Sequence, residues 1–397
     1  MATVVGEAAP AEERDIAPES EQRVTPLELF FDLVFVFAIT QVTQSMADDP
    51  TWAGLARGGL VLAAIWWAWV GYAWLTNVID PEEGIARLVV FLAMAAMLVV
   101  ALAIPGAFGD DALLFAVAYA VVRTAQIVLY AYGSPDADMK HSVFTLARST
   151  GLACTLLLIA AAFDGATQGA LWVLALLVDF GGPALFGVAG WKVAPGHFAE
   201  RHGLIIIVAL GESIVALGLG ASEIPLTAGP LLAATLGVVV VAGLWWAYFD
   251  VVALVAERKL TERQGVQRNK MARDSYSYLH LPMIAGIVLL ALGVKKTLAD
   301  VDDPLKPEIA AALMGGVALY LLAHVAFRLR NTGTLSIRRV VAALVLLALV
   351  PLGTEVDALV ALAATTVVVV ALIAYEAIRF SAARDQVRHH GLTSASR

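Results

Sequence analysis

Residues 26–47 read PLELFFDLVFVFAITQVTQSMA, and this stretch decides the fold. It holds mostly apolar and aromatic side chains over about 20 residues, the length that an α-helix needs to cross a bilayer. Pro26 stands at a position that suits the first turn of a helix. Two acids, Glu28 and Asp32, lie four residues apart and therefore on one helix face. The stretch predicts a membrane-spanning helix with a polar stripe.

The rest of the chain has the same character. Of its 397 residues, 60% are hydrophobic and 15% are charged, and the mean hydropathy is +0.80. Soluble domains have about 45–50% apolar and about 25% charged residues, which excludes the water-soluble enzymes and the nucleic-acid binders. The net charge of −8 also argues against a nucleic-acid partner. Cys154 is the single cysteine, so it forms neither an intramolecular disulfide nor a cysteine metal cluster, and we expect it to be a packing residue.

Twelve apolar segments are long enough to be membrane helices, since a lipid-exposed backbone must satisfy its own hydrogen bonds. Their predicted bounds are Pro26–Ala47, Gly54–Val78, Ile85–Pro105, Ala112–Tyr132, Ser142–Phe163, Thr167–Val188, His197–Gly220, Leu226–Val252, Tyr276–Val294, Ile309–Phe327, Ile337–Leu352 and Ala358–Arg379. We therefore predict an all-α fold, a polytopic membrane helix bundle. Residues 1–25 are predicted to form a disordered acidic tail, and residues 380–397 a C-terminal tail.

The distribution of basic residues predicts the orientation. If the N-terminus is cytoplasmic, Arg57, Lys295, Lys296 and Lys306 lie on the opposite side and Arg123 lies in the bilayer, which leaves the other 21 of the 26 Lys and Arg residues on the cytoplasmic side. Such an asymmetry follows the positive-inside rule. We expect a multi-pass protein of the cytoplasmic membrane with both termini cytoplasmic.

The two halves of the chain resemble each other. Residues 65–69 (IWWAW) match residues 244–248 (LWWAY), and the pair Tyr119 and Arg123 corresponds in spacing to Tyr320 and His324. These matches predict a duplication with halves 26–188 and 197–379. Six spans in each half give a parallel repeat, and such proteins place their pathway between the halves.

Ionisable side chains inside a bilayer are the most informative residues, because they usually face the bundle interior or a water path. Glu28, Asp32 and Thr40 form the polar side of the first segment and are candidates to line a cation or proton path. The alternative is that Glu28 and Asp32 are first-turn acids that favour the helix dipole and cap neighbouring helices.

The seventh segment carries a second polar group. His197, Glu200, Arg201 and Glu212 fall within about 120° of one another around the predicted helix. Glu212 lies near the midplane, roughly 18 Å from the start at about 1.5 Å per residue, where a carboxylate needs a partner or a proton. His197 and Glu200 are more readily explained as a hydrogen-bonded pair than as metal ligands, so we predict no metal site.

Arg123 and Asp179 are predicted to lie in the middle of the fourth and sixth segments. Like the four residues of the seventh segment, they are candidates for the substrate or ion path. They could form a mutual ion pair that locks helices together, or Arg123 could pair with Glu212 or Asp32 across the halves; the sequence leaves both open. The aromatic side chains that we expect to line the path are Phe31, Phe35, Trp66, Trp67, Trp245 and Trp246.

Two sequence motifs carry a family resemblance. Residues 28–38 (ELFFDLVFVFA), residues 197–204 (HFAERHGL) and residues 210–212 (LGE) resemble the bacterial low temperature requirement protein A (LtrA) family. The resemblance covers nearly the whole span region. It implies an integral membrane protein and supplies no agreed substrate or reaction.

Residues 30–40 (FFDLVFVFAIT) are also similar to the first-helix Phe-Ser-Asp motif of the endolysosomal and bacterial six-span-repeat potassium channels. Eukaryotic members of that family also contain two six-span repeats. In this sequence Phe31 stands at the serine position, and the seventh segment does not repeat the motif.

The sequence is therefore compatible with three functions. The first is a transporter-like protein that moves an ion or small solute through a polar site between the halves. The second is a potassium-like cation channel whose pore is lined by the first helix. The third is a non-transporting membrane protein of cold adaptation. We expect no enzymatic activity and no cofactor; the partners expected are the lipid bilayer and an unidentified ion or solute.

Overall fold

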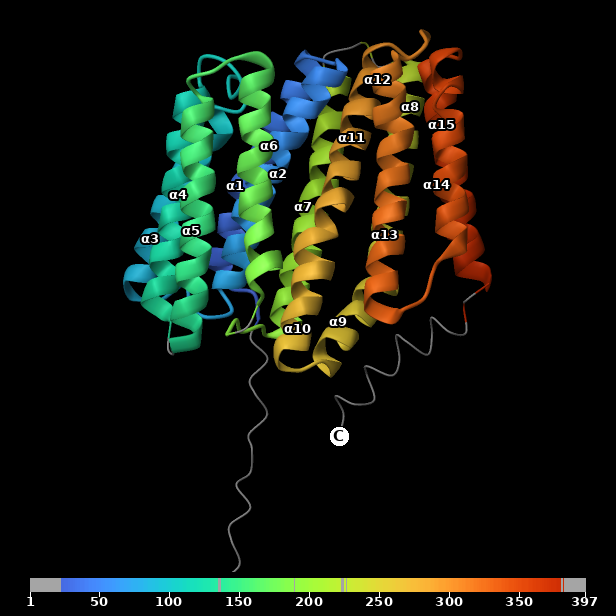
Figure 1. Cartoon of the computed structure of the whole chain (residues 1–397). Coiled ribbons are helices and arrows are strands. Elements are labelled where there is room, and N and C mark those ends of the chain that lie inside the picture. Colours follow the sequence, from blue (N-terminus) through green and yellow to red (C-terminus); the bar gives the residue numbers. More distant parts are fainter. Residues whose placement is uncertain are drawn as a thin grey trace, which may run out of the picture.

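A computed structural model describes residues 23–134, 137–188, 190–222 and 227–379, together with residues 225 and 381. The two predicted tails, residues 1–25 and 380–397, lie outside this part of the chain apart from residues 23–25 and 381. Within the described ranges, twelve helical segments are long and apolar enough to cross a membrane. They stand side by side as an all-α bundle, which confirms the predicted fold class (Figure 1).

The helices follow one another with short connections. Their bounds are α1 Pro26–Asp48, α2 Trp52–Leu75, α3 Gly84–Leu102, α4 Ala112–Gly133, α5 Ala137–Ala160, α6 Gly165–Phe186, α7 Pro195–Ser222, α8 Ala228–Phe249, α9 Val252–Glu262, α10 Gly265–Met271, the π-helical turn η1 Ala272–Tyr278, α11 His280–Ala299, α12 Pro307–Ala310, the π-helical turn η2 Ala311–Gly315, α13 Gly316–Thr332, α14 Ile337–Leu349, the 3-10 turn η3 Leu352–Thr354 and α15 Ala358–Arg379. The predicted spans agree with these helices except at their ends. The largest difference is the basic connection predicted between Val252 and Tyr276, most of which is helical as α9, α10 and η1.

The start of α1 is fixed by local sequence. Thr25 precedes Pro26, and its hydroxyl accepts a hydrogen bond from the backbone N–H of Glu28 (3.3 Å). The Glu28 carboxylate in turn accepts from the backbone N–H of Thr25 (2.8 Å). This reciprocal capping box satisfies two N–H groups that a helix start leaves without partners.

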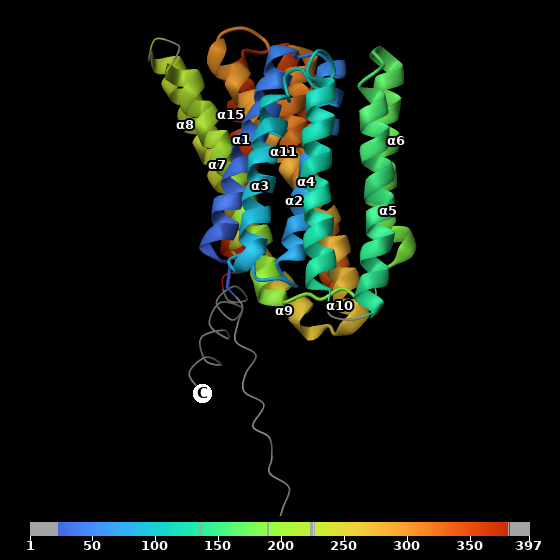
Figure 2. The same cartoon turned by 90° about the vertical axis from the view of Figure 1, so that its left-hand side faces the viewer.

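Helices α1–α6 and α7–α15 pack in the same order of neighbours. In the first group α1 packs on α2 and α3, the chain continues through α4, α5 and α6, and α6 returns to α2. In the second group α7 packs on α8 and α11, the chain continues through α13, α14 and α15, and α15 returns to α8. The two groups meet where α1 contacts α7 and α11. Figure 2 shows α5 and α6 as an outer pair.

The outer surface is apolar, as contact with lipid requires. Leu88 on α3 and Leu177 on α6 are each 65% exposed, although a water-soluble protein would cover most side chains of this kind. The chain is therefore a multi-pass membrane protein. We call the end of the bundle that carries α9 and α10 the α9–α10 end; it lies at the bottom of Figure 1.

Candidate functional site

Four polar side chains meet between α1 and α7 near the α9–α10 end. Arg201 donates hydrogen bonds to Glu28 (2.8 Å) and to Asp32 (2.7 Å). Nε2 of His197 lies 3.0 Å from the Glu28 carboxylate. Each of these four side chains is at most 4% exposed. Because His197 and Arg201 are one helical turn apart, as are the two acids, two facing helix surfaces assemble this group, which we call the α1–α7 cluster.

Helix α2 completes the surroundings of the cluster. The indole N–H of Trp69 donates to Oδ1 of Asp32 (2.8 Å), and the guanidinium of Arg201 lies 5.5 Å from the Trp69 ring centre. Oδ2 of Asp32 is buried and has no hydrogen-bond partner. A buried carboxylate with an open acceptor position can take a proton or a donor from a neighbour.

A large cavity lies beside the cluster. It has a volume of about 900 Å³ and is bounded by the start of α7, the end of α8, α9 and Tyr276. His197 and Glu200 both line it. Because His197 also contacts Glu28, this ring connects the cavity with the buried carboxylates. Glu200 lies at the cavity wall opposite the start of α1, where its carboxylate accepts from the backbone N–H of Val24 (3.4 Å).

A second polar level lies deeper between the same two helices. Glu212 is eleven residues beyond Arg201 on α7, roughly 17 Å along the helix axis at about 1.5 Å per residue, and it is 2% exposed. Its carboxyl group is hydrogen-bonded to the hydroxyl of Thr40 on α1. The same hydroxyl is 3.0 Å from the carbonyl of Val36. Thr40 and Glu212 therefore join the halves at mid-depth.

A third polar level follows towards the opposite end of the bundle. Lys295 at the end of α11 is hydrogen-bonded to Gln44 of α1. The Gln44 side chain also donates to Asp48 (2.7 Å). Since Gln44 is one turn beyond Thr40, the polar side of α1 continues from the cluster to the far end of the helix.

Two aromatic side chains of α1 pack beside the α1–α7 cluster. Phe31 and Phe35 are 3% and 2% exposed, and their ring centres are 5.2 Å apart. Phe31 also packs on Tyr72 of α2, with ring centres 4.6 Å apart. Phe31 therefore packs against α2 at the depth of the cluster, and Phe35 follows it one turn further along α1.

Arg123 and Asp179 lie away from the interface between α1 and α7. Nη2 of Arg123 is 3.0 Å from Asp179, and both side chains are at most 2% exposed. Thr150 of α5 bonds to both, at 2.9 Å and 3.0 Å, and Nη1 of Arg123 donates to the carbonyl of Trp67 (3.0 Å). Of the two pairings that the sequence left open, the structure has the mutual ion pair, which ties α4, α5 and α6 to α2.

The second half contains a comparable pair. Arg339 of α14 donates to Glu376 of α15 (2.9 Å) and to the carbonyl of Ala247 on α8 (3.1 Å). Its Nη1 is 2.9 Å from Nδ1 of His324 on α13. In each half, an arginine thus links an acid on the last helix to a backbone carbonyl on the second helix.

The predicted aromatic residues divide into two groups. Trp66 and Trp67 are buried at 3% and 4% exposure, and the Trp66 N–H donates to the carbonyl of Ser277 (2.8 Å). Ser277 belongs to the π-turn η1, in which carbonyls are displaced from the usual helical bonding. Trp245 and Trp246 are 46% and 39% exposed, on the outer side of α8. The structure therefore brings the first pair into the core and leaves the second pair at the surface.

Sequence reasoning did not include Gln44, Lys295 and Trp69 in the site. Gln44 continues the i, i+4 spacing from Thr40, so it was detectable. Lys295 was assigned to a loop because the predicted ninth span ended at Val294, whereas α11 continues to Ala299. Among the described residues, no group of three or more His, Cys, Asp or Glu side chains could hold a metal ion.

The fold and these buried ion pairs define a polytopic helical membrane protein with polar levels at the interface between α1 and α7. Comparison with known proteins then gives the family: the model for the bacterial low temperature requirement A protein (LtrA) matches residues 23–374, and the chain belongs to this family. It is also similar to an uncharacterized protein of Rhizobium meliloti (strain 1021), with 31% identity over 305 residues, which are 74% of each chain. No solved structure matches the chain.

Proposed function

We propose that the protein transports an ion or small solute across the cytoplasmic membrane, and that a proton bound at Glu212 takes part in each cycle. The observation that carries this proposal is the contact of Glu212 with Thr40, a buried carboxyl group at mid-depth between two halves. Intramembrane acids in such positions are typical of proton relays and substrate pathways.

The number of hydrogen atoms at this contact supports a proton site. The hydroxyl of Thr40 carries one proton and has two neighbouring acceptors, the Val36 carbonyl and the Glu212 carboxyl group. If the hydroxyl donates to Val36, Glu212 must supply its own proton to form the second hydrogen bond. If Glu212 is ionised, the hydroxyl can rotate towards it. Both protonation states are thus accommodated by rotation of one hydroxyl group.

The α1–α7 cluster is suited to be the gate on one side of this site. Arg201 holds both acids of α1, so separation of α1 from α7 requires the arginine to exchange its partners. The cavity of about 900 Å³ lies beside His197 at this level. We infer that opening at the cluster would connect the cavity with Glu212.

The proposed orientation places the α9–α10 end in the cytoplasm. This end carries the basic residues of the connection between α8 and α11, which are Arg258, Lys259, Arg263, Arg268, Lys270 and Arg273. Positive charge near membrane helices favours the cytoplasmic side. Both predicted tails would then be cytoplasmic, and the cavity beside the cluster would open to the cytoplasm.

A flux screen on the purified protein tests the proposal. Proteoliposomes that contain a pH-sensitive dye, or tracer potassium or sodium, are compared for the wild type, Glu212→Gln and Glu83→Gln. Glu83 is an exposed residue that makes no capping hydrogen bond, so its substitution is a matched control. We expect flux in the wild type and the control, and at least a tenfold loss in Glu212→Gln.

Two results would count against this function. Unchanged flux in a folded Glu212→Gln variant would show that transport does not need a proton at Glu212. Single-channel currents in planar bilayers would instead favour a cation channel, because alternating access is far too slow to give them. We propose transport rather than catalysis, and the absence of flux for every ion and solute tested would contradict that choice.

A further inference from the structure

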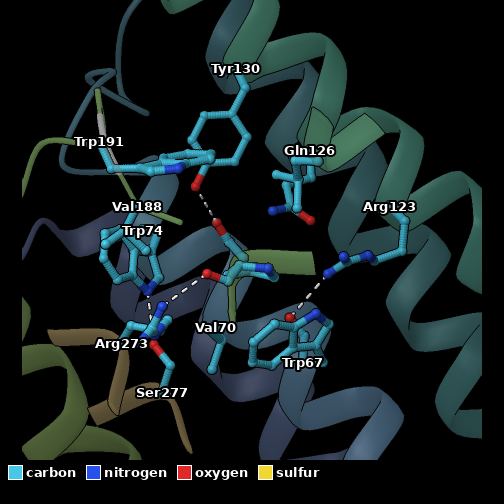
Figure 3. Close-up of a pocket in the computed structure, with 13 residues that line it drawn as sticks. Trp67, Val70, Trp74, Arg123, Gln126, Tyr130, Val188, Trp191, Arg273 and Ser277 are labelled. Atoms are coloured by element: carbon cyan, nitrogen blue, oxygen red, sulfur yellow. Dashed lines mark hydrogen bonds between the residues drawn. The ribbon is translucent and has the colours of Figure 1, made fainter. Parts of the chain in front are cut away.

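We propose that the protein contains a separate binding site, where helices of the first group meet the turn η1, for a small, uncharged, planar aromatic molecule that carries one hydrogen-bond donor. The site is a cavity of about 50 Å³ between α2, α4 and the connection that follows α6. Figure 3 shows the side chains that line it. The residues on which the proposal rests are Trp67, Trp74, Tyr130, Trp191, Gln126 and Arg123.

The walls are aromatic rings, and the polar atoms of two of them already have partners. The Tyr130 hydroxyl donates to the carbonyl of Gly71 (3.0 Å), and the Trp74 N–H donates to the hydroxyl of Ser277 (2.8 Å). Trp191 meets both rings edge-on, with ring centres 5.0 Å from Tyr130 and 6.1 Å from Trp74. Such walls offer ring faces and edges, which bind a planar aromatic molecule by stacked or edge-to-face contacts.

Two polar atoms of the residues that line the cavity, Oε1 of Gln126 and Nε of Arg123, are buried without a hydrogen-bond partner. Oε1 of Gln126 is buried without a hydrogen bond, and the residue is 1% exposed. Figure 3 shows the amide among the ring walls. A buried acceptor without a donor is costly, so a ligand O–H or N–H at this position would be favoured. The fold also makes room for this amide, because a Cβ on Gly71 would lie 2.1 Å from its Nε2 atom.

The charges near the cavity point to an uncharged ligand. The guanidinium of Arg123 is paired with Asp179 (3.0 Å). Arg273, at the other side of the cavity, is paired with Asp274 (2.7 Å) and donates to the carbonyl of Pro183 (2.9 Å). A cationic ligand would be repelled by two guanidinium groups, and an anionic ligand would have to compete with two carboxylates that are already bound.

The size and the access route set the ligand's dimensions. A water position needs about 10–15 Å³ of such volume, so the cavity has room for three to five waters, comparable to one ring with one substituent. A second cavity of about 130 Å³ shares Leu146, Pro183 and Trp191 with it and reaches His141 and Thr145 on α5. The route for a ligand would therefore lie between the start of α5 and the end of α6.

The test compares phenol with toluene, which have the same shape and differ in the donor. Binding to the full-length protein in detergent is measured by saturation-transfer NMR, with empty micelles as the blank. In the wild type both compounds are expected to bind. In Gln126→Leu the ratio of phenol to toluene affinity is expected to fall about tenfold, while Gln267→Leu, an exposed control, keeps the wild-type ratio. The ratio cancels the partition of each compound into micelles.

Two further variants keep the test decisive. Gly71→Ala displaces the Gln126 amide and is expected to lower the ratio of phenol to toluene affinity by the same factor. It replaces Gln126→Leu in the test if that variant does not fold. Trp191→Leu removes one aromatic wall of the cavity and is expected to lower the affinities for phenol and for toluene by the same factor. An unchanged ratio in Gln126→Leu and Gly71→Ala would overturn the proposal. So would wild-type binding equal to the micelle blank, because the cavity would then hold only water.

Discussion

Loss of the Arg201 side chain is expected to destabilise the bundle strongly. It is 1% exposed and bonds to Glu28 at 2.8 Å and to Asp32 at 2.7 Å. Removal of one partner from a buried ion pair costs about 3–5 kcal/mol, because a charge is left without compensation. Glu28 retains His197 and its capping contact, and Asp32 retains Trp69, so Arg201→Gln should lower the free energy of unfolding by about 3–5 kcal/mol rather than twice that amount.

The assay is unfolding of the purified protein in detergent by SDS titration, followed by tryptophan fluorescence. Arg57→Gln is the matched control, since its ion pair with Asp49 is exposed, at 48% and 44% for the two side chains, and should cost at most about 1 kcal/mol. The double variant Asp32→Asn/Arg201→Gln removes one charge of each sign and should recover more than half of the loss. If Arg201→Gln is as stable as Arg57→Gln, the reasoning about the α1–α7 cluster is refuted.

Three further outcomes are expected. Arg123→Met should lower the free energy of unfolding by about 3–5 kcal/mol, whereas the double variant Arg123→Met/Asp179→Leu should be close to the wild type. Equal losses in the single and the double variant would contradict the claim that Arg123 and Asp179 compensate each other's charge. Trp69→Phe removes the hydrogen bond to Asp32 and should cost about 1.5–3 kcal/mol in the same SDS titration, and a loss below 0.5 kcal/mol would mean that this bond is not important. At Gly286 an added Cβ would lie 2.6 Å from the carbonyl oxygen of Gly316, the first residue of α13, so Gly286→Ala should lower the thermal midpoint in detergent. Gly315→Ala is the control and should leave the midpoint unchanged, because a Cβ there would meet open space.

The fold was predictable because lipid imposes a simple rule on the sequence. The lengths of the apolar segments alone gave the number of membrane helices, and the spacing of Glu28 with Asp32 placed both acids on one face. The connections were less predictable. Helices α9 and α10 are polar, so they form by local helix propensity and cannot be recognised from the length of an apolar segment. The end of α11 was misplaced for the same reason, as Lys295 and Lys296 still belong to that helix.

Partners between helices could not be derived from single segments. Arg123 had three acids within plausible depth, and only tertiary packing selects Asp179. Trp66 and Trp245 occupy matching positions in the two halves, yet one is buried and the other faces outward, because the surroundings of α2 and α8 differ. A role in transport stays a prediction for all nine candidate residues, which are Glu28, Asp32, Thr40, Arg123, Asp179, His197, Glu200, Arg201 and Glu212.

The most direct test of the central claim is the rate of proton entry into liposomes that contain the wild type or Glu212→Gln at equal incorporation. The account predicts dye acidification by the wild type under an imposed pH gradient, and a rate at least tenfold lower for the variant. Equal rates for the two proteins, or a wild-type rate no higher than that of empty liposomes, would contradict it.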